Sequence, residues 1–85
     1  MNQRAWSKHL VIVKLPGEPR TYGELETVIQ VAVNRPSSDM IIDFSGIESI
    51  DQRSMLSLVV LNRILQKSMR HLGFCHIHDQ YSIHV

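Results

Sequence analysis

The residues with the clearest potential for chemistry are Asp51-Gln52-Arg53-Ser54, which stand between a loop and a long apolar run. An aspartate at a helix start accepts a hydrogen bond from an amide two or three residues later. A helix start also attracts anions, and the dipole together with Arg53 would favour a phosphate on Ser54. Arg53 itself opposes the dipole, which points to a contact outside the helix. The stretch therefore predicts either a simple helix cap or a loop that docks a partner.

Two histidines near the end of the sequence form a second candidate site. His76 and His78 alternate with Cys75 and Ile77, so a strand here would place both imidazoles on one face. A His-x-His pair is half of a metal site and supports a metal-dependent enzyme, the least favoured of three functions. The simpler interpretation is a partly exposed strand face with ordinary histidines and an inert Cys75 that points into the core. We therefore expect no metal and no cofactor.

Other routes to catalysis and to nucleic-acid binding lack support in the sequence. It contains no Gly-x-Gly-x-x-Gly, no phosphate-binding loop and no Gly-x-Ser-x-Gly turn. Asp43 and Asp51 flank one loop, but paired carboxylates in loops are common. The net charge is +1, and no basic stripe is interleaved with aromatic residues. The sequence thus predicts a protein that is not an enzyme and does not bind nucleic acid.

The size and composition fit one small domain, residues 1–85, in which 44% of the residues are hydrophobic. A single cysteine leaves no intrachain disulfide framework, which fits the reducing cytoplasm. No apolar run reaches the roughly 18 residues of a membrane span, and the N-terminus lacks the apolar segment of a signal peptide. We expect a cytoplasmic protein that does not insert into a membrane.

Hydrophobic spacing predicts strands and helices in strict alternation. Apolar, β-branched runs indicate strands at 9–15 and 40–44, and period-two alternation indicates a third strand at 74–78. Apolar residues three and four apart predict helices at 21–34 and 51–72.

The ends of these elements carry local signals. Thr21 and Glu24 have the spacing of a capping box at the start of the first helix. Gly73 is placed to end the second helix. Tyr81, Ile83 and Val85 alternate, which favours a further strand at the C-terminus.

The order strand, helix, strand, helix, strand is typical of an α/β fold with a parallel sheet and right-handed connections. The 40–44 strand is apolar at successive positions, as expected when helices cover both of its faces. The loops at the carboxyl ends of parallel strands gather along one edge, where ligands usually lie. Here that edge would be built from residues 16–18, from residues 43–51 and from the chain that begins at Asp79.

Across roughly residues 9–79 the sequence resembles a STAS domain, the module shared by anti-sigma factor antagonists and the cytoplasmic ends of sulphate transporters. The matching segments are LVIVKLPGE, ELETVIQVAV, MIIDFSGIESID, MLSLVVLNRILQKSMRHLG and FCHIHD. The family pattern is a strand ending in Asp, a loop with an apolar–Asp step, a helix and a Gly. Asp43, Ile50-Asp51 and Gly73 match it. The resemblance implies parallel central strands with packed helices and a role in protein–protein interaction.

Two departures from the family bear on function. Many anti-sigma factor antagonists carry Asp-Ser-Ser/Thr-Gly-Leu at the helix start and are phosphorylated on the second hydroxyl. Arg53 takes that position here, and Ser54 takes the position of the glycine, so Ser54 is a candidate phosphorylation site one residue out of register. STAS domains usually continue with another helix, strand and helix. With the sequence ending at Val85, part of that cover is expected to be absent.

The resemblance implies docking of an anti-sigma kinase-like protein through the 45–54 loop and the helix that follows. The expected partner-binding residues are Asp43, Ser45, Gly46, Asp51, Gln52, Arg53, Ser54 and Met55. The missing acceptor hydroxyl at residue 53 favours the alternative, a constitutive structural subunit of a lipid-transport ABC system or of a signalling scaffold. The 51–72 helix is apolar over more than the usual stripe of about 100°. This surface either packs on both the sheet and the neighbouring helix or docks a partner or a second copy, which would make a homodimer.

Overall fold

The structure, a computed structural model, describes residues 9–77 and confirms the predicted α/β order of strand, helix, strand, helix, strand. The elements are β1 (Leu10–Lys14), α1 (Thr21–Asn34), β2 (Asp39–Asp43), α2 (Gln52–Lys67) and β3 (Leu72–Cys75). The strand expected from Tyr81, Ile83 and Val85 lies outside the described residues, as does His78.

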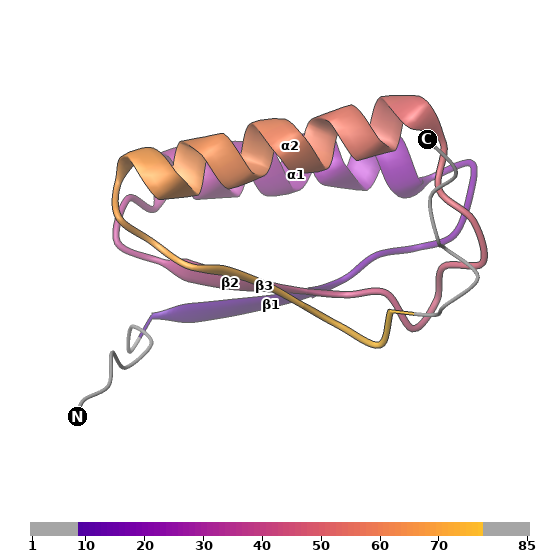
Figure 1. The fold of residues 1–85 in the computed structure, drawn as a ribbon, viewed down its shortest axis with the longest axis horizontal. Helices are drawn as coiled ribbons and strands as arrows, with labels where there is room; N and C mark the ends of the chain where they lie inside the picture. Colours follow the sequence, from indigo (N-terminus) through magenta and orange to yellow (C-terminus); the bar gives the residue numbers. More distant parts are fainter. Residues whose placement is uncertain (1–8, 78–85) are drawn as a thin grey trace.

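The three strands form one parallel sheet in the order β1-β2-β3. Both crossovers step in the same direction across the sheet. Because such crossovers are right-handed, they place α1 and α2 on the same face, and Figure 1 shows both helices on one side of the strands. The expectation that helices cover both faces of β2 is therefore wrong for the described chain.

The hydrophobic core lies between the helices and one face of the sheet. Its fully buried members come from every layer: Leu15, Leu25, Ala32, Met40, Ile42, Leu61 and Leu65. Alternation along β1 sends Val11 and Val13 toward this core, whereas Ile12 points to the other face and is 64% exposed. No described helix covers that second face.

The start of α1 does not use the predicted capping box. The N-cap is Arg20, which makes no side-chain cap hydrogen bond. The hydroxyl of Thr21 is buried and donates instead to the carbonyl oxygen of Pro16, at 2.8 Å. Thr21 therefore fastens the loop that follows β1 to the first turn of the helix.

The end of α2 also differs from its prediction. The helix stops at Lys67, and Gly73 lies within β3 rather than at the helix end. The termination is a Schellman motif: the amide of Arg70 donates to the carbonyl of Leu65, and the amide of Met69 donates to that of Gln66. Met69 takes the left-handed backbone position, with φ 59°, that glycine usually fills. The missing glycine explains why the sequence pattern placed the end several residues too late.

Candidate functional site

The carboxyl edge of the sheet is where β1 and β2 release their loops side by side. Asp43 ends β2, and its Oδ1 accepts a hydrogen bond from the amide of Ser45, at 2.8 Å. That turn brings Gly46 against the end of β1, where a Cβ on Gly46 would lie 3.1 Å from the carbonyl oxygen of Leu15. A larger residue would have to push the two loops apart by a few tenths of an ångström, so glycine suits this close approach at the start of the 45–54 loop.

The far end of the loop is the capped start of α2, as predicted. Asp51 is the N-cap, and its Oδ1 accepts from the amide of Ser54, at 2.8 Å. This hydrogen bond is the main reason that the pKa of Asp51 lies below its ordinary value, with the charge of Arg53 acting in the same direction. The carboxylate that holds the helix start is thus ionised at neutral pH.

Arg53 makes the contact outside α2 that its unfavourable place in the first turn indicated. Its guanidinium carbon lies 4.0 Å from the centre of the Tyr22 ring of α1. The contact is a cation–π interaction within the chain, and it ties the starts of the two helices together. The place of Arg53 in the first turn of α2 is therefore explained without a partner protein.

Ser54 occupies a different environment from its neighbours in the sequence. Gln52 and Arg53 are exposed, whereas Ser54 is 0% exposed, and its hydroxyl has no hydrogen-bond partner within the described chain. A kinase reaches this hydroxyl only when the first turn of α2 opens. Phosphorylation of Ser54 stays a prediction, and it would require the first turn of α2 to open.

An apolar groove of about 420 Å³ opens on the helix side of the sheet, beside β3. It is lined by Phe44, Ile50, Met55, Leu58, Val59, Asn62, Phe74 and Ile77. Phe44 and Phe74 form its floor in an edge-to-face pair with ring centres 5.7 Å apart. Phe74 is 45% exposed although it points to the same side as the helices. Of the predicted partner-binding residues only Met55 lines this groove; the aromatic floor was missed.

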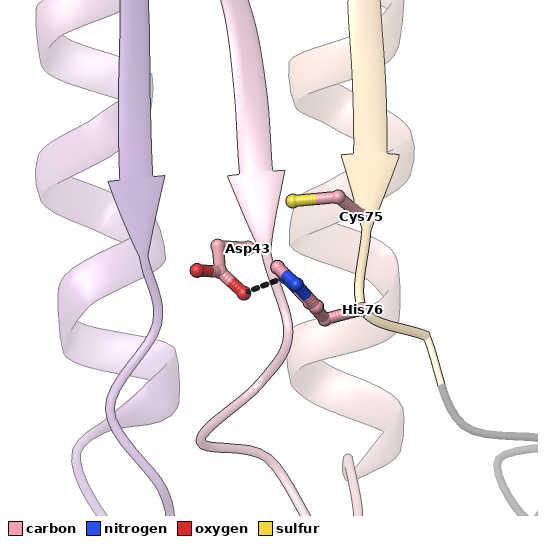
Figure 2. Close-up of side chains that lie close together, drawn as sticks. All are labelled: Asp43, Cys75 and His76. Carbon is pink, nitrogen blue, oxygen red and sulfur yellow. Dashed lines mark hydrogen bonds and ion pairs between the residues drawn. The ribbon is translucent and has the colours of Figure 1, made fainter.

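Three side chains meet on the opposite face, at the ends of β2 and β3: Asp43, Cys75 and His76 (Figure 2). His76 Nδ1 lies 2.9 Å from Asp43 Oδ1. The amide of Ser45 is the largest cause, and His76 a smaller one, of the lowered pKa of Asp43. The prediction that Cys75 points into the core is wrong, because its register partner Asp43 lies on the face away from the helices.

The structure divides the predicted partner-binding residues between the two faces of the sheet. Asp43 belongs to the face that carries Cys75, whereas Met55 lines the groove under α2. Ser45, Gly46, Asp51 and Gln52 lie exposed between them. The predicted set is thus the rim that joins two different surfaces and not one compact site.

Comparisons of the chain with models of protein families, with curated proteins and with solved structures gave no significant match. The resemblance to STAS domains therefore rests on the sequence pattern and stays a prediction. Among residues 9–77, neither helix combines the length and the apolar character needed to cross a membrane.

Proposed function

We propose that the chain is a non-catalytic protein-interaction module that resembles an anti-sigma factor antagonist. Its partner would be a regulatory protein of the anti-sigma kinase type, docked by the 45–54 loop and α2. The observation that carries this proposal is the apolar groove beside β3. Apolar side chains gathered in an open groove are costly to leave in water, and a partner that fills the groove removes that cost.

The groove and the 45–54 loop form one continuous surface. Ile50 of the loop and Met55 of the first turn of α2 both line the groove wall. Val59 and Phe74, 50% and 45% exposed, continue it along the helix and across to β3. A partner that contacts the exposed loop is therefore placed to bury these apolar side chains as well.

The test is a calorimetric binding titration between the purified chain and an anti-sigma kinase-type protein from the same organism. Val59→Asp puts a charge into the groove, and we expect at least a tenfold loss of affinity. Val33→Asp, on exposed α1 surface outside the groove, is the matched control and should bind as the wild type does. Equal affinities for the two variants, or no binding by the wild type, would contradict the proposal.

A second candidate function, a constitutive structural subunit of a transporter or signalling scaffold, is favoured by the helix start. Arg53 holds the place of the acceptor hydroxyl, and its guanidinium packs on the Tyr22 ring. Ser54 is buried. A surface built in this way suits permanent association better than a phosphorylation switch. Sedimentation of the chain alone separates a homodimer, which buries the groove against a second copy, from a monomer that awaits a different protein.

Arg53→Ser decides between the two functions. In an antagonist, the new hydroxyl restores the acceptor of the resembled family, and a cognate serine kinase should phosphorylate residue 53. Ser54→Ala in the same background is the control for labelling at the neighbouring position. Absence of labelling at residue 53, in a folded variant that also fails to bind the kinase, would support the structural subunit.

A further inference from the structure

We propose that Asp43, Cys75 and His76 form a binding site for a divalent metal ion of the zinc type. A carboxylate oxygen, a thiol sulfur and an imidazole nitrogen from these residues all lie within 4.8 Å of one another. The proposal is independent of the docking function, because the three side chains lie on the face of the sheet opposite the groove (Figure 2).

The fold brings the three donors together by two separate devices. Parallel pairing sets Asp43 directly opposite Cys75, so both side chains project from the same face of neighbouring strands. His76 should point to the other face, since consecutive strand residues alternate. Its backbone instead takes the left-handed conformation, with φ 58°, and this returns the ring to Asp43. A non-glycine residue rarely adopts that conformation.

The distances suit a tetrahedral ion. Two nitrogen or oxygen ligands at the usual zinc distance lie about 3.3 Å apart, and a sulfur lies about 3.5 Å from either. The 2.9 Å between His76 Nδ1 and Asp43 Oδ1 has to open by only a few tenths of an ångström. The ion would take the place of the hydrogen-bonded proton between these two atoms, and the neutral ring would then carry its proton on Nε2. Rotation about the short Cys75 side chain closes the remaining gap.

The donor set selects the kind of metal. Thiolate and imidazole favour zinc and its neighbours, whereas magnesium and calcium take sites made wholly of oxygen. When the metal–sulfur bond forms, the Cys75 thiol releases one proton to solvent, and neutral His76 supplies a lone pair. The ionised Asp43 and the Cys75 thiolate then balance the two charges of the ion. Three protein ligands leave the fourth position to water.

A second Asp–His pair in the same sheet offers a matched control. His71 Nδ1 lies 3.4 Å from Asp39 Oδ2, where Asp39 begins β2 and His71 immediately precedes β3. No described cysteine accompanies this pair, since the single cysteine is Cys75. If an Asp–His pair by itself were sufficient, both ends of the sheet would bind the ion.

The experiment is a titration of the reduced full chain with Co²⁺, followed by displacement with Zn²⁺. We expect one Co²⁺ per chain, a thiolate-to-cobalt charge-transfer band and the intense visible bands of tetrahedral cobalt. Cys75→Ser should abolish the charge-transfer band. Asp43→Asn and His76→Ala should each weaken affinity at least tenfold. His71→Ala, His78→Ala and His84→Ala should leave it unchanged.

A second readout protects the test against a variant that fails to fold. His76 is exposed, so His76→Ala should keep the wild-type circular dichroism. Zn²⁺ should raise the melting temperature of the wild type but not that of His76→Ala. Absence of a charge-transfer band in the wild type would overturn the proposal. So would a band that His76→Ala and Asp43→Asn leave unchanged, or one that depends on His78 in place of His76.

Discussion

The two ends of the sheet hold the same pair of residue types and use them differently. At the amino end, the carboxylate of Asp39 is 4% exposed, and it accepts the backbone amide of His71 at 2.8 Å as well as facing its ring. At the carboxyl end, Asp43 and His76 are 20% and 64% exposed and lie beside a thiol. The buried pair fastens β3 to β2, whereas the open pair presents its atoms to solvent. The burial of Asp39 and the thiol beside Asp43 together separate the structural pair from the candidate ligand site.

Arg70 reinforces the structural character of the amino end. Its Nη1 donates to the carbonyl oxygens of Ala32, Arg35 and Ser38, at 3.0, 2.7 and 3.3 Å. These carbonyls belong to the end of α1 and the turn that follows, where helix geometry leaves acceptors without partners. One guanidinium therefore joins α1 and the start of β2 to the segment that leads into β3.

The largest effect is expected from Arg70→Ala, at the amino end. Loss of charge-assisted hydrogen bonds to three carbonyls should lower the free energy of unfolding by about 3 kcal/mol in chemical denaturation. Arg63→Ala, an exposed position on α2, is the control and should change stability little. Equal stabilities of the two variants would contradict the conclusion that Arg70 stabilises the amino end of the sheet.

Asp39→Ala should have the next largest effect. It removes the acceptor of the His71 amide and should destabilise the fold by about 2 kcal/mol, again by chemical denaturation. Asp43→Ala should lower the free energy of unfolding by clearly less, because the Asp43 carboxylate is open to water. If the carboxyl-end variant proved the less stable of the two, the difference drawn between the pairs would be wrong.

Two substitutions to glycine sharpen the comparison further. Met69 and His76 are the described non-glycine residues with positive φ, at 59° and 58°, one near each end of the sheet. Glycine removes the strain of the left-handed conformation in the folded state but adds conformational entropy to the unfolded state. The free energy of unfolding of each variant should therefore rise by about 0.5 kcal/mol, measured by thermal unfolding. Only His76→Gly should lose the affinity for Co²⁺. A stability loss in Met69→Gly would show that its side chain contributes more than its backbone costs.

The smallest effect is expected from acid. The amides of Ser45 and Ser54 hold the pKa values of Asp43 and Asp51 below the ordinary 3.8. The stability these carboxylates provide is therefore present above that value and is lost as the pH falls through the folded pKa. The melting temperature of the wild type should decline more steeply below about pH 4 than that of Asp43→Asn or Asp51→Asn. Parallel curves would show that neither hydrogen bond contributes to acid stability.

Much of the fold could be predicted because its signals are local. The α1 bounds and the Asp51 cap follow from apolar spacing and from one carboxylate beside free amides, and both agree with the structure. The predictions for the start of α1 and the end of α2 were wrong, because another interaction replaced the one that the local pattern indicated. Thr21 bonds to the preceding loop instead of capping, and Met69 ends α2 before the glycine that usually marks such an end.

The candidate sites depended on information that no short segment contains. Cys75 was expected in the core because alternation along a strand separates two sets of side chains without showing which set faces the core. Its side was decided by pairing with Asp43, a residue far away in the sequence. The groove could be anticipated only as an excess of apolar surface on α2. Its floor required Phe44 and Phe74 to meet across the sheet.

The sequence by itself determined the order of the elements, the helix cap at Asp51 and the apolar character of α2. Each depends on residues within a few positions of one another, and local sterics and hydrogen bonding act over that range. The tertiary structure alone decided which face each strand residue takes, which aspartate is buried, and that Asp43, Cys75 and His76 converge. These depend on strand register and crossover handedness, which bring distant residues together.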